Sequence, residues 1–266
     1  MLKDITLGQY YPGNSVVHRA DPRTKIIMTI FFLVALFMVE SWWGFLPVVL
    51  FLAGFIALSK VSVLYVLRGI KAIWILVLIT AVFNVFFTDG KVLFEWGFLR
   101  VTYEGLSLAG FMAVRICLLI VATSMMTLTT TPIALTDGIE TLLRPLKKLK
   151  VPVHEFSMMM TIALRFIPTI MEETDKIIKA QSARGADFES GNLWQKAKAM
   201  IPIFVPLFVS AFRRADELAT AMECRCYQGD VHRTKLKSLK FGLVDLFGFL
   251  LMLALGVALW AVEAFV

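Results

Sequence analysis

The sequence predicts an all-α integral membrane protein with about five transmembrane helices and a cytoplasmic segment of three helices before the last of them. The chain of 266 residues is 58% hydrophobic and only 18% charged, with a mean hydropathy of +0.76. A soluble globular domain is closer to a quarter charged and under half apolar. Five apolar stretches also approach the roughly 17–25 residues that a helix needs to cross a bilayer core.

The five apolar stretches are separated by charged or turn-forming connections, and each one predicts a membrane helix. They run over about 26–39, 43–58, 70–87, 106–128 and 241–262. The first 25 residues contain no apolar core of a signal peptide, so we expect the first helix to act as the insertion signal.

Positive charges indicate the orientation, because cytoplasmic connections of membrane proteins carry an excess of Lys and Arg. The net charge is +7, and the stretch 132–240 holds 17 of the 27 Lys and Arg residues. Arg19, Arg23 and Lys25 precede the first helix. We therefore expect the N-terminus and this stretch in the cytoplasm and, after five crossings, the C-terminus outside. Such a surplus of positive charge is typical of loops that face anionic lipid. The sequence has no basic patch interleaved with aromatic residues, so it does not predict nucleic-acid binding.

These features divide the chain into three parts: an N-terminal membrane domain with four helices at 1–131, a cytoplasmic or interfacial domain at 132–240, and a C-terminal membrane helix at 241–266. The middle part predicts helices over 133–150, 153–183 and 193–226. The last two begin apolar and become amphipathic. Three prolines are expected to kink or interrupt these helices: Pro168, Pro202 and Pro206. Two glycines, Gly185 and Gly229, are expected to terminate them at or just past their ends.

Both long helices are expected to end on an arginine between two small residues. Arg184 follows Ala183 and precedes Gly185, and 41 positions later Arg225 stands between Cys224 and Cys226. A guanidinium with small neighbours can protrude and pair bidentately with a carboxylate in a partner's groove. The alternative is that each arginine merely complements the negative end of its helix. Two matched contexts favour docking onto a two-fold partner.

Four methionines stand in the apolar halves of the two long helices. They are Met158, Met159, Met160 and Met200. Methionine suits a surface that accommodates several partners, and it suits ordinary core packing as well. Both interpretations stay open at this point.

The remaining polar candidates do not form a catalytic or metal site. Cys224 and Cys226 point about 200° apart on a helix, and His232 alone does not complete a zinc set. The sequence has no phosphate-binding loop and no nucleophile–base or metalloprotease motif. Arg115 lies inside the fourth apolar stretch, where it could line a substrate path or pair with Glu104 or another polar neighbour. We therefore expect a chain that is not an enzyme and holds no cofactor.

The chain resembles the transmembrane T component of energy-coupling factor (ECF) transporters, a family of ABC-type importers, over essentially its whole length. The matching stretches are Tyr11–Ser15, His18–Lys25, Pro152–Phe156, Ile162–Pro168, Ala180–Gly185 and Arg225. The run Ala-Leu-Arg-Phe-Ile-Pro together with the Arg184 segment is specific. The family often has alanine where this sequence has Cys224, and cysteine is nearly as small.

This resemblance implies two long coupling helices that cross on the cytoplasmic side of a multi-pass protein in the bacterial cell membrane. It implies that Arg184 and Arg225 dock into two ABC ATPase subunits, similar to EcfA and EcfA′, which bind ATP and Mg. It further implies that the upper helix surfaces hold one membrane-embedded, substrate-binding S component for vitamin uptake. The four methionines are a possible S-component interface.

Three rival functions remain from the sequence. The first is the permease of a cobalt or nickel ECF-type importer. The second is a conventional permease domain that lines its own substrate path, which would need a polar cavity between its helices. The third is a membrane-embedded enzyme, for which the sequence supplies no catalytic constellation. The transported compound is not encoded in this chain, because the S component selects it in this family.

Overall fold

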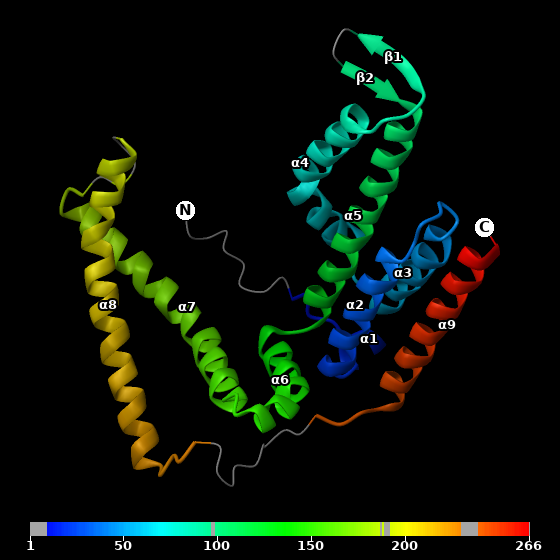
Figure 1. Ribbon diagram of the computed structural model, residues 1–266. Helices are drawn as coiled ribbons and strands as arrows, with labels where there is room; N and C mark the ends of the chain where they lie inside the picture. Colours follow the sequence, from blue (N-terminus) through cyan, green and yellow to red (C-terminus); the bar gives the residue numbers. More distant parts are fainter. Residues whose placement is uncertain (1–9, 97–98, 187, 189–191, 230–238, 266) are drawn as a thin grey trace. The chain divides into compact units, whose positions relative to one another are not determined.

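The computed structural model describes residues 10–96, 99–186, 188, 192–229 and 239–265 (Figure 1). The chain divides into two compact units. We call the unit that contains the described residues 10–142 and 239–265 the membrane unit. The unit that contains the described residues from 143 to 229 is called the long-helix unit.

The membrane unit is a bundle of helices with one small hairpin. Its helices are α1 (Val16–Arg19), α2 (Pro22–Phe37), α3 (Phe45–Ser59), α4 (Val63–Phe87), α5 (Tyr103–Thr129), α6 (Pro132–Leu143) and α9 (Leu243–Phe265). Between α4 and α5, strand β1 (Val92–Trp96) pairs antiparallel with β2 (Leu99–Thr102). The predicted all-α class therefore holds for the body of the unit, and the hairpin is an addition that the sequence analysis did not expect.

Among the described residues, three helices are long and apolar enough to cross a membrane: α5, α9 and, from Trp194, α8 of the other unit. A fourth is α4 if its halves Val63–Lys71 and Ile73–Phe87, bent by 55°, count as one span. With 16 and 15 residues, α2 and α3 are only about 22–24 Å long and fall short of a bilayer core of about 30 Å. A helical membrane protein with three or four candidate spans is thus established, and the count of five stays a prediction.

The core of the membrane unit lies where α2, α3 and α5 meet, with α9 packed beside them. Leu36, Val39, Val48 and Met125 are completely buried there. Because lipid is as apolar as this core, such packing stabilises a membrane bundle mainly through van der Waals contacts between the side chains. The outward faces of the same helices are apolar and exposed, as expected of surfaces that contact lipid.

A buried polar cluster ties three helix ends together. The Asp245 carboxylate, at the start of α9, accepts hydrogen bonds from the Asp21 N–H at 2.9 Å and from the Gly242 N–H at 2.7 Å. Lys25 in α2 donates from Nζ to the Thr129 carbonyl at the end of α5, at 2.9 Å. The side chains of Asp21, Lys25 and Asp245 are all buried. The starts of α2 and α9 therefore lie at the same end of the bundle as the end of α5.

A second contact closes the opposite end of α9. The Glu263 carboxylate accepts hydrogen bonds from the backbone N–H groups of Glu40 and Ser41 and from the Ser41 hydroxyl. The end of α9 therefore lies beside the turn between α2 and α3. α2 and α9 therefore run in the same direction along the bundle, and α5 runs in the opposite direction.

The long-helix unit contains a short 3-10 helix, η1 (Arg144–Leu149), and the two long helices α7 (Val153–Ala183) and α8 (Leu193–Cys224). The predicted helix over 133–150 is wrong as a single element, because α6 ends at Leu143 and the separate turn η1 begins at Arg144. The predicted bounds of the two long helices are within two residues of those observed. Asn192 begins α8 with a reciprocal capping box to Gln195.

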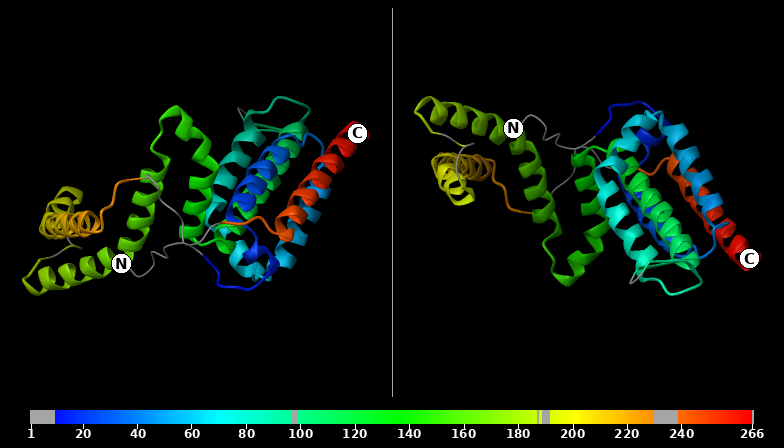
Figure 2. Two further views of the ribbon diagram at one scale, coloured as in Figure 1. Left: turned by 90° about the horizontal axis from the view of Figure 1, so that it is seen from below. Right: turned by 90° about the horizontal axis from the view of Figure 1, so that it is seen from above.

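The three prolines do not interrupt the long helices. Pro168 lies inside α7, and Pro202 and Pro206 lie inside α8, which are continuous. Both further views show α7 bending along its length (Figure 2). A bend is the usual response of a helix that keeps an internal proline.

Candidate functional site

The end of α7 is built by a compact set of backbone hydrogen bonds. The Gly185 N–H donates to the Ser182 carbonyl and the Ala186 N–H donates to the Gln181 carbonyl, both at 3.0 Å. Gly185 has φ +87°, a left-handed conformation that glycine adopts freely. This is the Schellman arrangement, which satisfies the last helical carbonyls and turns the chain away sharply. Arg184 is the last residue before the turn and is exposed.

The end of α8 repeats this arrangement at every position. The Cys226 N–H donates to the Glu223 carbonyl at 2.9 Å and the Tyr227 N–H donates to the Met222 carbonyl at 3.1 Å. Cys226 has φ +56° and occupies the place that Gly185 has in α7. Arg225 precedes it and is exposed. The repeat of 41 positions in the sequence is therefore also a repeat in backbone geometry.

One predicted helix terminator is corrected by this finding. Gly185 ends α7 as expected, but Gly229 does not end α8. Gly229 does have φ +72°, yet it lies three residues beyond the turn that Cys226 makes. Cysteine can take this role because φ near +57° is the small left-handed region open to ordinary residues.

The arginine side chains are not needed to finish their helices. The backbone N–H of Arg184 donates to the Gln181 carbonyl, and that of Arg225 donates to the Met222 carbonyl. In the part of the chain that the structure describes, neither guanidinium makes a hydrogen bond or ion pair. Ala183, Cys224 and their neighbours at the two tips are exposed as well. The tips are therefore bare guanidinium groups on short, well-ordered turns.

An ion pair joins the two long helices between these ends. Arg214 of α8 donates from Nη2 to Glu173 Oε2 of α7 at 2.8 Å. A hydrogen bond from Ser210, followed by those from Arg214, lowers the pKa of Glu173 below its ordinary value. Glu173 and Arg214 are also 41 positions apart. The pair therefore joins equivalent positions of the repeat, and the two arginine tips extend from it in opposite directions because the helices are antiparallel.

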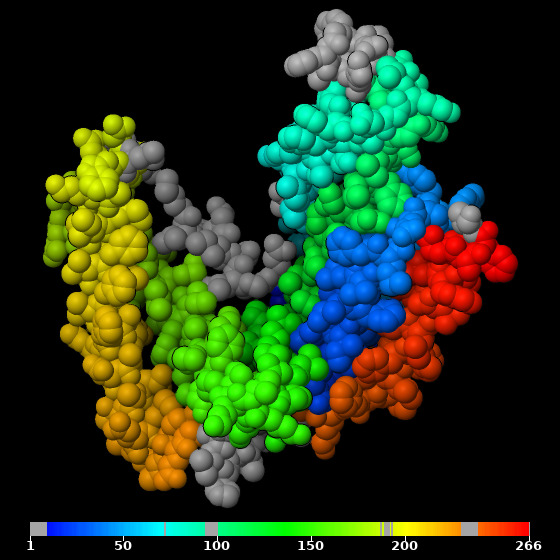
Figure 3. All heavy atoms as spheres, in the orientation of Figure 1, coloured from blue at the N-terminus to red at the C-terminus, as the bar shows by residue number. Residues whose placement is uncertain are grey.

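The four predicted methionines do not form one patch. Met158 lines a groove beside the end of α8, whereas Met159, Met160 and Met200 are exposed. Met158 and Met200 lie on opposite sides of the Glu173–Arg214 pair, each about 20 Å from it along its own helix. An exposed row of apolar side chains instead follows α8, the helix drawn from yellow to orange in the space-filling view (Figure 3). The row consists of Ile201, Phe204, Val205, Phe208, Val209 and Phe212.

Arg115 has a local structural partner. Its Nη2 donates to the Val39 carbonyl just beyond the end of α2, and its guanidinium lies 4.8 Å from the centre of the Phe111 ring. Glu104, the partner that the sequence analysis considered, instead accepts from the Lys91 N–H at 2.7 Å. The polar-neighbour interpretation of Arg115 is therefore the one that the contacts support.

Comparison with known proteins gives the family. Residues 13–236 match the family described as CbiQ, cobalt transport protein. An energy-coupling factor transporter transmembrane protein EcfT from Clostridium kluyveri is 58% identical over 257 residues, which cover 96% of this chain and 95% of the relative. The chain belongs to the EcfT family. Similar proteins of the same description are found in Ruminiclostridium cellulolyticum, 57% identical over 245 residues and 92% of each chain, and in Bacillus subtilis, 49% identical over 240 residues, 90% of this chain and 91% of the relative.

This membership confirms the resemblance and the function drawn from the sequence. The chain is a non-catalytic transmembrane coupling component of an energy-coupling factor transporter. Among the described residues, no group of three or more His, Cys, Asp or Glu side chains could hold a metal ion.

Sequence reasoning missed two features of the site. The first is the ion pair between Glu173 and Arg214, which the sequence analysis did not predict. These two residues are 41 positions apart, as Arg184 and Arg225 are. Arg165 was noted only as part of a motif, and the structure places it in the same groove as Arg225. Extending the register along both helices would have found the first feature. The second depends on which face of α7 meets the end of α8.

Proposed function

We propose that the chain transmits ATP-driven motion from two ATPase subunits to a membrane-embedded S component that carries a vitamin. The ATPases bind ATP and Mg, and Arg184 and Arg225 dock one into each of them, with Ala183, Gly185, Cys224 and Cys226 keeping the tips slim. The complex lies in the bacterial cell membrane, with the N-terminus of this chain in the cytoplasm and the C-terminus outside.

The observation that carries this proposal is the repeated tip geometry. Two bare guanidinium groups stand just before helix-ending turns of the same hydrogen-bond pattern, at opposite ends of one antiparallel helix pair. A single partner site would leave one of them unused. Two similar acidic grooves on a pair of subunits fit both, because guanidinium pairs bidentately with carboxylate.

The coupling step follows from this placement. ATP binding closes the ATPase pair and brings its two grooves together. Arg184 and Arg225 follow the grooves, so the ends of α7 and α8 move relative to each other while the Glu173–Arg214 pair keeps the helices in contact. The movement changes the surfaces at the opposite ends of the helices, and the S component there is reoriented or released.

The surface for the S component is proposed to be apolar and adaptable. Met159, Met160 and Met200 are exposed, and the apolar row on α8 is exposed over more than three helical turns. Exposed apolar surface of this extent is normally covered by lipid or by a partner. A membrane-embedded partner fits it better than a water-soluble one.

A cobalt or nickel importer remains the second candidate, because the matching family is described as a cobalt transport protein. The rival in which this chain forms its own substrate path has less support. Among the described pockets of the membrane unit, the one beside Lys25 and Thr129 has a volume of only 30 Å³. The hollow of 340 Å³ between Trp43, Leu46 and Phe265 is lined by apolar residues and offers no polar path. Uptake assays with the S component that co-purifies would separate a vitamin from a metal ion.

The docking role is tested by replacing Arg184 and Arg225 with alanine, singly and together. Losing one arginine from a paired, desolvated interface costs about 2–5 kcal/mol, so each variant should bind its ATPase at least about thirtyfold more weakly. The double variant should lose both ATPase co-purification and uptake. Arg213→Ala is the matched control, since Arg213 is an exposed arginine of α8 away from the tips. Unchanged assembly and uptake in the double variant would sink the docking role.

A further inference from the structure

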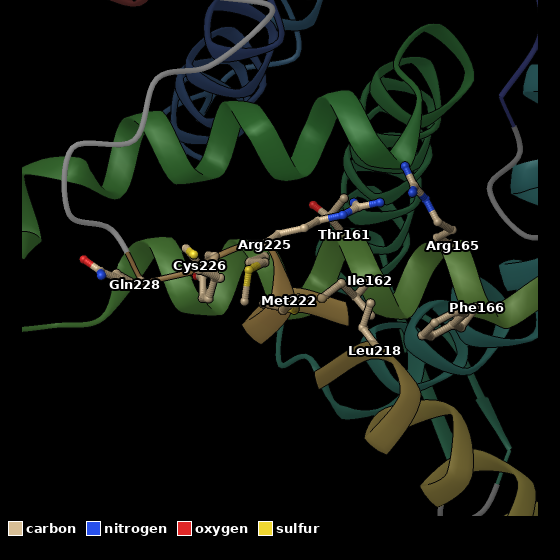
Figure 4. A pocket seen from close by; sticks show the side chains of 12 residues that line it. Thr161, Ile162, Arg165, Phe166, Leu218, Met222, Arg225, Cys226 and Gln228 are labelled. Atoms are coloured by element: carbon tan, nitrogen blue, oxygen red, sulfur yellow. The ribbon is translucent and has the colours of Figure 1, made fainter. Parts of the chain in front are cut away.

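A groove with a volume of 530 Å³ lies between the first half of α7 and the end of α8 (Figure 4). From α7 it is lined by one face with helical spacing: Met158, Thr161, Ile162, Arg165 and Phe166. From α8 and the turn after it, Leu218, Met222 and Arg225 line it, followed by residues 226–229. The docking arginine of α8 therefore stands at the edge of a cavity on its own chain.

Two guanidinium groups share this groove. Arg225 extends over it from the end of α8, and Arg165 extends from α7 (Figure 4). No Asp or Glu is among its described lining residues, although Glu155 lies 3.9 Å from the position that a Cβ on Gly229 would occupy, at the edge. Both arginines are exposed. Two positive charges beside an apolar groove lining favour a bound segment that carries both a carboxylate and apolar side chains.

The other tip has no second arginine. In the 41-residue register, the α8 position that corresponds to Arg165 is Pro206, and it would face the Arg184 end. The position of α8 equivalent to Arg165 therefore supplies no second guanidinium beside Arg184. The two ends of the helix pair differ in charge although their backbone turns are alike.

We propose that this groove receives an acidic side chain, carried on an apolar segment, of the ATPase subunit that docks at Arg225. The inference rests on the proposed function and deepens it. Docking at this end is reciprocal: Arg225 enters the ATPase, and a segment of the ATPase enters the groove, where its carboxylate lies between Arg225 and Arg165. The ATPase at the Arg184 end makes a simpler contact.

An ATPase segment fits the groove better than an anionic lipid does. The groove is continuous with the tip at Arg225, which is the proposed ATPase contact. Arg213, Asp216 and Glu217 are exposed and separate the groove residues of α8 from its exposed apolar row. A lipid that covered the apolar row would have to cross this charged stretch.

Photo-cross-linking of the whole complex identifies the occupant. A photoreactive phenylalanine analogue replaces Thr161, which lines the groove, in the complex reconstituted with its ATPases and S component in lipid nanodiscs. We expect a cross-link to an ATPase peptide that contains Asp or Glu beside apolar residues. A cross-link to lipid, to the S component or only to this chain would overturn the inference. The same analogue at exposed Ala163, which does not line the groove, is the control.

Arg165→Ala provides the second measurement. We expect affinity for the ATPase pair to fall by about tenfold or more, and the salt dependence of binding to weaken, because one buried ion pair is lost. Arg213→Ala should change affinity by less than about twofold. If Arg165→Ala binds like the wild type while Arg225→Ala does not, the groove inference fails and the proposed docking stands. If neither variant changes binding, the proposed function itself fails.

Discussion

Replacing Gly185 by alanine isolates the backbone geometry of one docking tip from every other contact. Gly185 has φ +87°, outside the left-handed region near +57° that ordinary residues occupy. Apart from its chain neighbours and its own helix backbone, no atom of the described residues lies within 4 Å of the position that the new Cβ would take. The methyl group therefore meets no neighbour, and the whole effect of the substitution comes from backbone strain.

The expected size follows from two opposing effects. A left-handed conformation costs an L-residue about 1–2 kcal/mol. Alanine loses less conformational entropy on folding than glycine, which offsets about 0.4–1 kcal/mol. The turn at the end of α7 should therefore weaken by about 1 kcal/mol, which is a factor of about five in an opening equilibrium.

Hydrogen–deuterium exchange on the purified chain in detergent measures this opening. In Gly185→Ala, the amides of residues 185 and 186, whose hydrogen bonds close the turn, should exchange about fivefold faster. ATPase affinity should change little as long as the closed turn stays the major state. Cys226→Gly is the matched control at the other tip, where relief of strain at φ +56° should leave exchange unchanged or slower. Wild-type exchange in Gly185→Ala would refute the left-handed turn at this tip.

Two further predictions concern the ion pair and the polar cluster. Hydrogen bonds lower the pKa of Glu173, so it stabilises the helix pair above the ordinary carboxyl value of 4.5 and loses this effect as the pH falls through the lowered pKa. In the wild type, losing this pair at acid pH should weaken the packing of α7 on α8 by no more than about 1 kcal/mol and so make proteolysis of the two helices faster. Glu173→Gln should abolish this acid-induced increase in proteolysis, and an increase that persists in the variant would contradict the assignment. Asp245→Ala leaves the N–H groups of Asp21 and Gly242 without their acceptor, so thermal unfolding followed by tryptophan fluorescence should show a loss of about 2–5 kcal/mol. Asp245→Asn keeps one acceptor oxygen and should lose less; equal losses would argue against the hydrogen bonds as the cause.

The sequence predicted the long helices closely because their signals are local. Apolar spacing that becomes amphipathic and a small-residue turn after Arg184 each act within a few residues. The same reasoning named Gly229 as the residue that terminates α8, which is not where the helix-ending turn lies. Cys226 makes this turn instead, and only the backbone hydrogen bonds of the turn reveal this.

Features that depend on contacts between residues far apart in the chain could not be predicted from local sequence patterns. Asp245 meets Asp21 across 224 positions, and Lys25 meets Thr129 across 104. Arg115 illustrates the same limit, because its partner is the Val39 carbonyl, a backbone group that any residue type could provide. The groove at Arg165 likewise arises from the way two helix faces meet.

The position of the Glu173–Arg214 pair gives the proposed coupling a simple mechanical form. Arg184 lies eleven residues beyond Glu173, and Arg225 lies eleven residues beyond Arg214, so each tip is about 16 Å from the pair along its helix. In the other direction, Met158 and Met200 lie about 21–22 Å from it. Equal arms mean that a symmetric closure of two ATPases displaces both helices equally about this contact. In the proposed coupling, the opposite arms are longer, and they carry this movement to the ends with the exposed methionines. Because the pair joins equivalent positions of the repeat, it is the contact that best preserves this symmetry while the helix ends move.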